Sequence, residues 1–209
     1  MDIGQWTVIV LSALFVAWFF NGTAKNRKLG DQVLRWVQGG TSQLGRVSEA
    51  RRIRGSAVQF SMKDAAAPFR KLDLTVTLES RENPPLWLYD RLKGKRDELV
   101  IQGTLRNAPQ QEFEITRVKT DLGAAQEMTG ASMPKMLHIS SGTYALTSID
   151  GIDPGRLELL EQFLSKYSDA VQRLTLKRSA PHLMVRLKLT PLLETTPQDF
   201  IKDLQGLIA

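Results

Sequence analysis

The sequence predicts an α+β fold: an N-terminal transmembrane helix followed by a single domain with an antiparallel sheet and packed helices. Three observations predict it. A run of 22 residues near the N-terminus carries no charge, several later segments alternate apolar and polar residues, and amphipathic segments that begin at proline lie between them. A chain of 209 residues is long enough for one domain with a core of its own.

The uncharged run extends from Ile3 to Ala24, and its centre reads WTVIVLSALFVAWFF. At about 1.5 Å per residue it spans roughly 30 Å, the thickness of a bilayer's hydrocarbon core. Trp6 and Trp18 lie near its two ends, where amphipathic rings favour the membrane interface. A cleaved signal peptide is the alternative, but no basic residue precedes the run, and the Asn-Gly-Thr that follows its apolar centre is a poor cleavage site. Residues 1–24 are therefore predicted to form an uncleaved anchor.

The charge of the chain is concentrated directly after this anchor. Residues 25–60 contain eight basic and two acidic side chains, whereas residues 61–209 are almost balanced. Since Lys25, Arg27 and Lys28 follow the span, the positive-inside rule predicts an outer N-terminus and a cytoplasmic domain. We expect residues 25–55 to form a basic juxtamembrane segment with a short helix over Asp31–Val37, interrupted by Gly39-Gly40.

Residues 56–209 are predicted to form the α+β domain. An alternating pattern, which buries one face of a strand, predicts strands over 58–62, 72–78, 99–105, 113–115, 144–148, 171–176 and 183–189. Asn107–Gln110 is predicted to be a hairpin loop between two of them. Proline in a first turn predicts helices over 84–92, 154–167 and 197–208, and a short helix is expected over Leu122–Met128.

The sequence gives little support for catalysis. There is no cysteine, which excludes thiol chemistry and cysteine-ligated metals, and only His138 and His182 offer imidazole. No phosphate-binding loop, dinucleotide fingerprint, zinc-protease motif or nucleophile elbow is present. We therefore predict a protein that is not an enzyme, with no catalytic, metal or cofactor-binding residues.

Two groups of residues are candidates for membrane-surface or partner contact. The first group is basic and follows the anchor: Arg46, Arg51, Arg52 and Arg54. Anionic lipid headgroups attract such residues, and RNA or ribosome contact is the alternative, disfavoured because no aromatic residue is interleaved with the arginines. The second group surrounds the predicted helix 84–92: Trp87, Tyr89, Arg91, Lys93, Lys95 and Arg96. One interpretation is an amphipathic helix that docks on the sheet and leaves a solvated basic face. The other is a surface that binds a partner or lipid headgroups, since aromatic residues and arginine often dominate such surfaces. The two interpretations are compatible.

The part of the chain after the anchor, roughly Leu29 to Ala209, resembles the calumin family of single-span endoplasmic-reticulum proteins of the PAT complex. The resemblance is clearest over Leu160–Leu174, and it extends to Leu88–Leu92 with Asp97–Leu105, and to Met133-Pro134 and Ile149-Asp150. It implies a membrane span, a short helix and an α+β cytosolic domain. It also implies a role in the insertion or assembly of multi-spanning membrane proteins, with a translocon component or another membrane protein as a partner.

Two departures limit what the resemblance implies. Calumin has a long acidic luminal region, whereas Met1 to Gln5 precede the apolar centre of the span here, so luminal calcium binding is not implied. Calumin continues into a charged coiled coil that contacts the ribosome, whereas this sequence ends at Ala209, so a ribosome contact loses its main support. We expect a membrane-anchored, non-enzymatic factor that assists membrane-protein biogenesis. The alternative is a membrane-surface scaffold or an anionic-headgroup-binding module.

Overall fold

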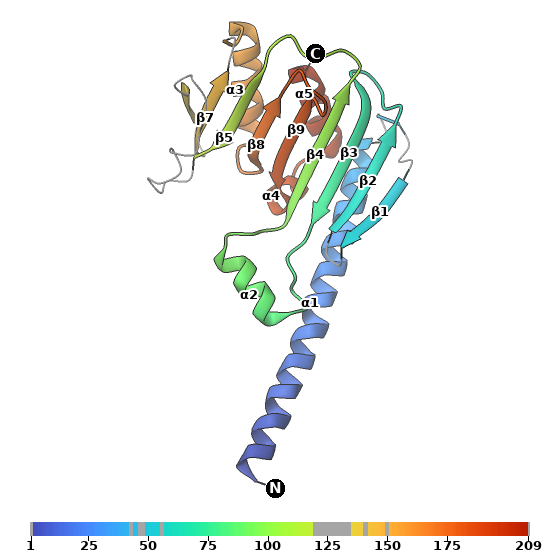
Figure 1. The fold of residues 1–209 in the computed structure, drawn as a ribbon, viewed down its shortest axis with the longest axis vertical. Coiled ribbons are helices and arrows are strands. Elements are labelled where there is room, and N and C mark those ends of the chain that lie inside the picture. The colour runs from blue at the N-terminus through green and yellow to red at the C-terminus, as the bar shows by residue number, and fades with distance from the viewer. Residues whose placement is uncertain are drawn as a thin grey trace.

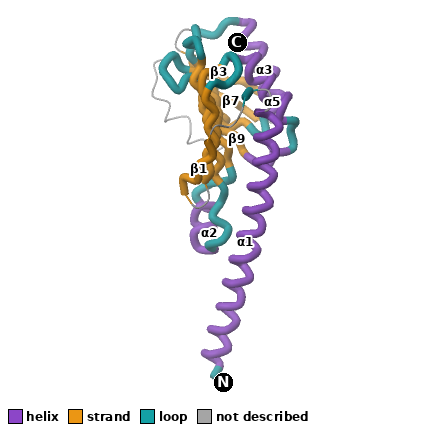
Figure 2. Tube along the Cα trace, turned by 90° about the vertical axis from the view of Figure 1, so that its right-hand side faces the viewer, coloured by secondary structure: helices purple, strands orange, loops and turns teal. Residues whose placement is uncertain are grey.

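In a computed structural model, the described residues of this chain are 2–41, 44–45, 49–54, 57–118, 135–139, 142–148 and 151–208. Within these residues, nine strands form one antiparallel sheet, and helices α1, α3 and α5 cover one face of it (Figures 1 and 2). A long N-terminal helix projects beyond the sheet at one end. The predicted fold class, α+β with a long apolar N-terminal helix, is confirmed.

The sheet has the strand order β1-β2-β3-β4-β9-β8-β5-β7-β6. Its strands are β1 (Glu49–Arg54), β2 (Ala57–Lys63), β3 (Phe69–Thr77), β4 (Glu98–Leu105), β5 (Phe113–Arg117), β6 (Lys135–Ile139), β7 (Gly142–Ser148), β8 (Val171–Leu176) and β9 (Leu183–Lys188). Strand β1 lies at one edge and β6 at the other. All seven predicted strands are present, whereas β1 and β6 were not predicted.

Alternation along the strands separates a buried face from an open polar face. In β3, Leu72, Leu74 and Val76 are buried, while Asp73 and Thr75 between them are partly exposed. The buried face packs against the helices, and the open face carries cross-strand charge pairs such as Arg173 with Glu114, 2.7 Å apart. A sheet with one solvated face explains why the period-two pattern was visible in the sequence.

Helix α1 (Ile3–Thr41) is a single helix of 39 residues, so the anchor and the predicted short helix are continuous. The expected interruption at Gly39-Gly40 is wrong, because no proline breaks the helix and both glycines pack against a neighbour. A Cβ atom on Gly40 would lie 3.2–3.3 Å from Ile201 and Pro197, and Gly39 is similarly close to Pro197. The glycines thus permit a close helix contact.

The other helices that cover the sheet are α3 (Pro154–Tyr167), α4 (Leu189–Leu193) and α5 (Pro197–Ile208). Helix α5 packs against the C-terminal half of α1, where Trp36 and Phe200 have ring centroids 5.7 Å apart. Phe200 also contacts Phe163 and Tyr167 of α3. This aromatic cluster joins three helices over the sheet, so the second half of α1 belongs to the domain core.

Asn107–Gln110 is not a hairpin loop, because β4 and β5 are not neighbours: β9 and β8 lie between them. The C-terminal strands are inserted between two strands that are adjacent in the sequence, which local patterning does not reveal. The short helix expected over Leu122–Met128 lies outside the described residues.

Candidate functional site

The first half of α1 is apolar and unburied. Its side chains from Ile3 to Phe20 are exposed, and its residues form a helix long and apolar enough to cross a membrane. Further along the same helix, Val33, Trp36 and Val37 are buried in the domain. One helix therefore passes from an exposed apolar segment into the core of the sheet domain.

Between these two parts, one stripe of α1 holds a loop of the domain. Trp18, Gly22 and Asn26 are four residues apart and therefore lie on one side of the helix. Trp18 Nε1 donates a hydrogen bond to the Arg81 carbonyl at 2.9 Å. A Cβ atom on Gly22 would lie 2.2 Å from that same carbonyl oxygen, so only glycine permits this approach. Asn26 Nδ2 donates to the Glu79 carbonyl at 3.0 Å.

Arg81 is the centre of this contact. Its Nη1 donates to Asp97 Oδ1 at 2.8 Å and to Asn26 Oδ1 at 2.9 Å, and its Nη2 bonds to the other Asp97 oxygen. The hydrogen bond with Asp97, a buried side chain, raises the pKa of Arg81. The guanidinium thus connects α1 to the residue that precedes β4.

Glu79 extends the same network to helix α2 (Pro84–Leu92). The Glu79 side chain is buried, lies 3.5 Å from Arg81, and accepts a hydrogen bond from Trp87 Nε1 at 2.7 Å. The Trp87 ring also lies 5.5 Å from the Trp18 ring. We call Trp18, Gly22, Asn26, Glu79, Arg81, Trp87 and Asp97 the clasp, because together they fix α2 beside α1.

The exposed side of α2 is apolar. Pro85, Leu88, Tyr89 and Leu92 follow the i, i+3, i+4, i+7 spacing of a single helical stripe, and all four are exposed. Leu92 is 79% exposed and Leu88 53% exposed, whereas Asp90 is the residue of α2 that is buried. The predicted docking of this apolar face on the sheet is therefore wrong: α2 turns its polar and indole groups toward the domain and its stripe outward.

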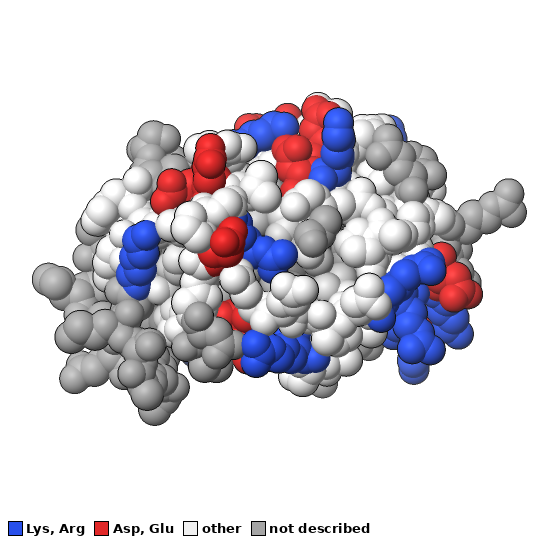
Figure 3. Space-filling model, turned by 90° about the horizontal axis from the view of Figure 1, so that it is seen from above, with Lys and Arg blue, Asp and Glu red and all other residues white. Residues whose placement is uncertain are grey.

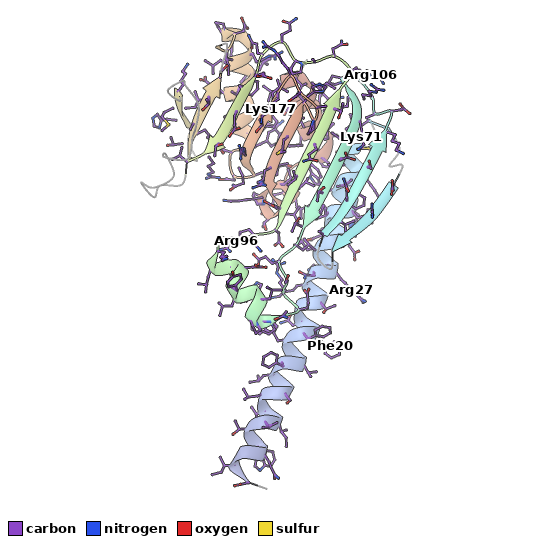
Figure 4. All side chains as sticks on the ribbon, viewed as in Figure 1. Phe20, Arg27, Lys71, Arg96, Arg106 and Lys177 are labelled. Atoms are coloured by element: carbon purple, nitrogen blue, oxygen red, sulfur yellow. The ribbon has the colours of Figure 1, made fainter. Side chains whose placement is uncertain are left out.

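Basic side chains surround this stripe. Arg91 lies over the Trp87 ring at 5.0 Å, and Lys93 lies over the Tyr89 ring at 4.4 Å. Lys95 forms a salt bridge with Asp90 at 2.7 Å, while Arg96 donates to the backbone carbonyls of Arg91 and Lys95. The structure thus brings together all six predicted residues from Trp87 to Arg96. Figure 4 places Arg96 at the end of α2 and Arg27 on the other side of α1.

A groove separates the start of α2 from α1. Its volume is about 720 Å³, and it is lined by Phe15, Val16, Phe19, Phe20 and residues 82–85. The four residues of α1 belong to the apolar run, so the groove opens at the level where that run ends (Figure 4, at Phe20). Sequence patterning did not predict it, because it exists only where the loop approaches the helix.

Of the first predicted basic group, the described member Arg51 is not part of this site. Arg51 lies in β1, where it contributes with Lys71 and Asp73 to a small polar hollow of about 160 Å³ on the sheet. Arg46 and the side chains of Arg52 and Arg54 lie outside the described residues. Since β1 pairs with β2 over Glu49–Arg54, this stretch belongs to the sheet rather than to a separate juxtamembrane segment.

Elsewhere the described surface has mixed chemistry. The end of the domain far from the N-terminus of α1 carries both basic and acidic side chains (Figure 3). In the part of the chain that the structure describes, no group of three or more His, Asp or Glu side chains could hold a metal ion. The clasp and α2 are therefore the strongest candidate site.

A scan against protein-family models finds no match, and a search of curated proteins finds no matching sequence. The resemblance to the calumin family therefore stays a prediction.

Proposed function

We propose that this is a single-span membrane protein whose domain is held in one orientation on the cytoplasmic membrane surface, where it acts as a non-enzymatic scaffold. The observation that carries the proposal is the continuity of α1, which is exposed and apolar from Ile3 to Phe20 and buried in the domain core at Val33–Val37. A helix without a break transmits the orientation of the anchor to the domain, and the clasp adds a second attachment.

The distribution of charge supports the cytoplasmic side. Lys25, Arg27 and Lys28 are exposed directly after the apolar run, and Arg91, Lys93 and Arg96 lie on or just beyond the neighbouring α2. Basic residues near the cytoplasmic leaflet gain about 1 kcal/mol each from acidic lipids. A basic collar around the end of the span is the arrangement expected of that side.

Protease protection tests the span and its orientation. The full chain is reconstituted in sealed vesicles that expose their cytoplasmic face, and protease is added outside. We expect digestion of the domain and survival of a fragment that contains residues 3–20, which becomes accessible when detergent is added. Complete protection of residues 25–209 would contradict the orientation, and extraction of the chain by alkaline carbonate would contradict the span.

The groove favours a second, more specific function: assistance in the insertion or assembly of multi-spanning membrane proteins, as the resemblance to calumin implies. Such a factor needs an apolar surface near the bilayer where a partner can bind, and the groove beside Phe15 and Phe19 provides one. A partner segment would contact α1 on this side and the loop 82–85 at its cytoplasmic end.

Site-specific crosslinking tests this second function. The chain has no cysteine, so Phe19→Cys places a single photoactivatable benzophenone in the groove. Leu14→Cys is the matched control, because Leu14 is equally apolar, exposed and at similar depth, but the helical period places it on the other side of α1. We expect membrane-protein or translocon adducts from Phe19→Cys only. Equal adduct patterns at both positions would contradict a groove-specific partner.

A further inference from the structure

A helix that is docked on its own domain buries its apolar stripe, whereas α2 exposes its stripe. Its members Leu88, Tyr89 and Leu92 are 53%, 52% and 79% exposed, although α2 is only nine residues long. An exposed apolar stripe of this density marks an interaction surface. The domain-facing side of α2, with Trp87 and the buried Asp90, is already occupied by the clasp and by Lys95.

The position of α2 identifies what covers the stripe. The clasp joins α2 to α1 between Trp18, which lies within the apolar run, and Asn26, two turns further on. Helix α2 is therefore fixed at the level where α1 leaves the hydrocarbon, if α1 spans a membrane as proposed. An apolar stripe at that level, with basic side chains beside it, has the chemistry of a helix that lies in the membrane interface.

We propose that α2 is an in-plane membrane helix, with Pro85, Leu88, Tyr89 and Leu92 inserted at the boundary between headgroups and acyl chains and its cations bound to acidic phospholipids. This inference rests on the proposed membrane span and adds the ligand of the site. The cations have suitable positions: Arg91 and Lys93 lie over the Trp87 and Tyr89 rings. Lys93 can therefore contact a phosphate while the exposed Tyr89 ring contacts lipid, and Arg91 can contact a phosphate while it stays against the Trp87 ring of the clasp.

The clasp gives the inserted helix a fixed depth. Interfacial helices bury their apolar face about 5–10 Å into the headgroup and acyl boundary. Here the depth is set by protein contacts, because Arg81 and Glu79 connect α2 to α1 through Asn26 and Trp87. The domain would thus be attached to the bilayer at two points, α1 and α2, which would restrict its tilt relative to the membrane surface.

A single-cysteine experiment on the full chain tests this proposal. Leu92→Cys reports the stripe, and Leu159→Cys is the matched control. Leu159 is also an exposed leucine of a helix (47%), but its helix, α3, lies at the end of the domain far from the N-terminus of α1 (Figure 1). Each variant is labelled with bimane and reconstituted in vesicles of phosphatidylcholine and phosphatidylserine. Quenching is measured with nitroxide on lipid chains and with iodide in the water.

We expect several-fold stronger lipid-nitroxide quenching at Leu92→Cys than at Leu159→Cys, and the reverse order with iodide. Equal iodide quenching at the two positions, in protein that resists carbonate extraction, would overturn the inserted helix while leaving the span intact. Efficient bismaleimide crosslinking between two Leu92→Cys chains would also overturn it, because a second copy would then cover the stripe. Lipid quenching that is unchanged without phosphatidylserine would overturn acidic headgroups as the ligand.

Discussion

Helices α2 and α5 differ in where they place the same kind of surface. Both begin at proline, both are short, and both carry an apolar stripe. Helix α5 buries its stripe under α1 and α3, at Phe200, Ile201, Leu204, Leu207 and Ile208. Helix α2 exposes its stripe and is held by indole and charged groups instead. An apolar stripe therefore indicates that a helix packs against an apolar surface, but it does not indicate which surface that is.

The attachment of each helix follows from its surroundings. Helix α5 lies over a sheet whose covered face is apolar, so dispersion and the hydrophobic effect hold it there. Helix α2 lies beyond the end of the sheet, beside the loop that carries Arg81, where polar groups satisfy one another.

The largest effect is expected from truncating matched leucines in the two stripes. Leu204→Ala in α5 should lower the free energy of unfolding by about 2–5 kcal/mol, because it leaves a cavity in the core. Leu92→Ala in α2 should change it by less than about 0.5 kcal/mol, because Leu92 is exposed. Thermal unfolding of the full chain in mild detergent measures both. A similar loss for the two variants would mean that the stripe of α2 is covered by the protein itself.

The second effect is expected at the clasp. Arg81→Met leaves Asp97 and Glu79 without their cation, and we expect a cost of about 1.5–3 kcal/mol for the lost charged hydrogen bonds. Arg173→Met is the control, since its salt bridge with Glu114 is on the open face and more exposed. Amide hydrogen exchange should become faster across α2 in Arg81→Met alone. Unchanged exchange in α2 would show that the clasp does not hold it.

The third effect tests the close approach of the two backbones. Gly22→Ala places a methyl group 2.2 Å from the Arg81 carbonyl oxygen, so the loop must move. We expect this to lower the free energy of unfolding by an amount near the lower limit of the range of about 1–3 kcal/mol that overpacking costs. Gly4→Ala is the control, because nothing lies within 4 Å of its added Cβ atom. Faster hydrogen exchange in α2 is expected only for Gly22→Ala. The same exchange in both variants would argue that the loop adapts without cost.

The smallest effect concerns a polar contact of α5. Partial burial would raise the pKa of Asp203, but hydrogen bonds from Lys166 and Tyr167 outweigh it and lower that pKa. A lowered pKa stabilises the fold above the ordinary value of an aspartate, about 4, and this contribution disappears as the pH falls through the folded-state value. Because the side chain is about one-third exposed, we expect less than about 1 kcal/mol.

Asp203→Asn measures this contribution directly. The difference in unfolding free energy between the wild type and this variant should shrink as the pH falls from about 4, the ordinary aspartate pKa, through the lower folded-state pKa of Asp203. Burial, together with the bond to Asp203, also raises the pKa of Tyr167 to about 12. The stability that the raised Tyr167 pKa contributes should therefore be complete below the ordinary tyrosine pKa of about 10 and be lost only above it. For Asp203→Asn, a difference from the wild type that grows as the pH falls would contradict the lowered pKa of Asp203.

Much of the fold could be predicted because its signals are local. The alternation in β3 and the Asp153-Pro154 start of α3 appear as expected, with Asp153 capping the helix through its bonds to Gly155 and Arg156. Strand β1 was missed because its sequence, EARRIR, has no alternation, and it becomes a strand by pairing with β2. The order of the strands was also beyond local patterning, since β9 and β8 separate β4 from β5.

The candidate site was predicted in its composition but not in its geometry. The basic and aromatic residues from Trp87 to Arg96 are clustered in the sequence, and they stay clustered in the structure. The contacts of Trp18, Gly22 and Asn26 were not predicted. Their spacing of four places them on one side of a helix, but no local pattern indicates which residues they face. Arg51 was grouped with the membrane surface on charge alone, and its strand carries it onto the sheet.

The sequence by itself determined the apolar run, the strands that alternate and the amphipathic helices that begin at proline, because hydrophobic periodicity and proline geometry act within a few residues. Only the tertiary structure decided that α1 continues unbroken into the core, and that the stripe of α2 faces away from the domain. Both outcomes depend on contacts between residues far apart in the chain, such as Trp18 with Arg81. A periodic pattern marks a surface to be buried, and long-range packing determines what buries it.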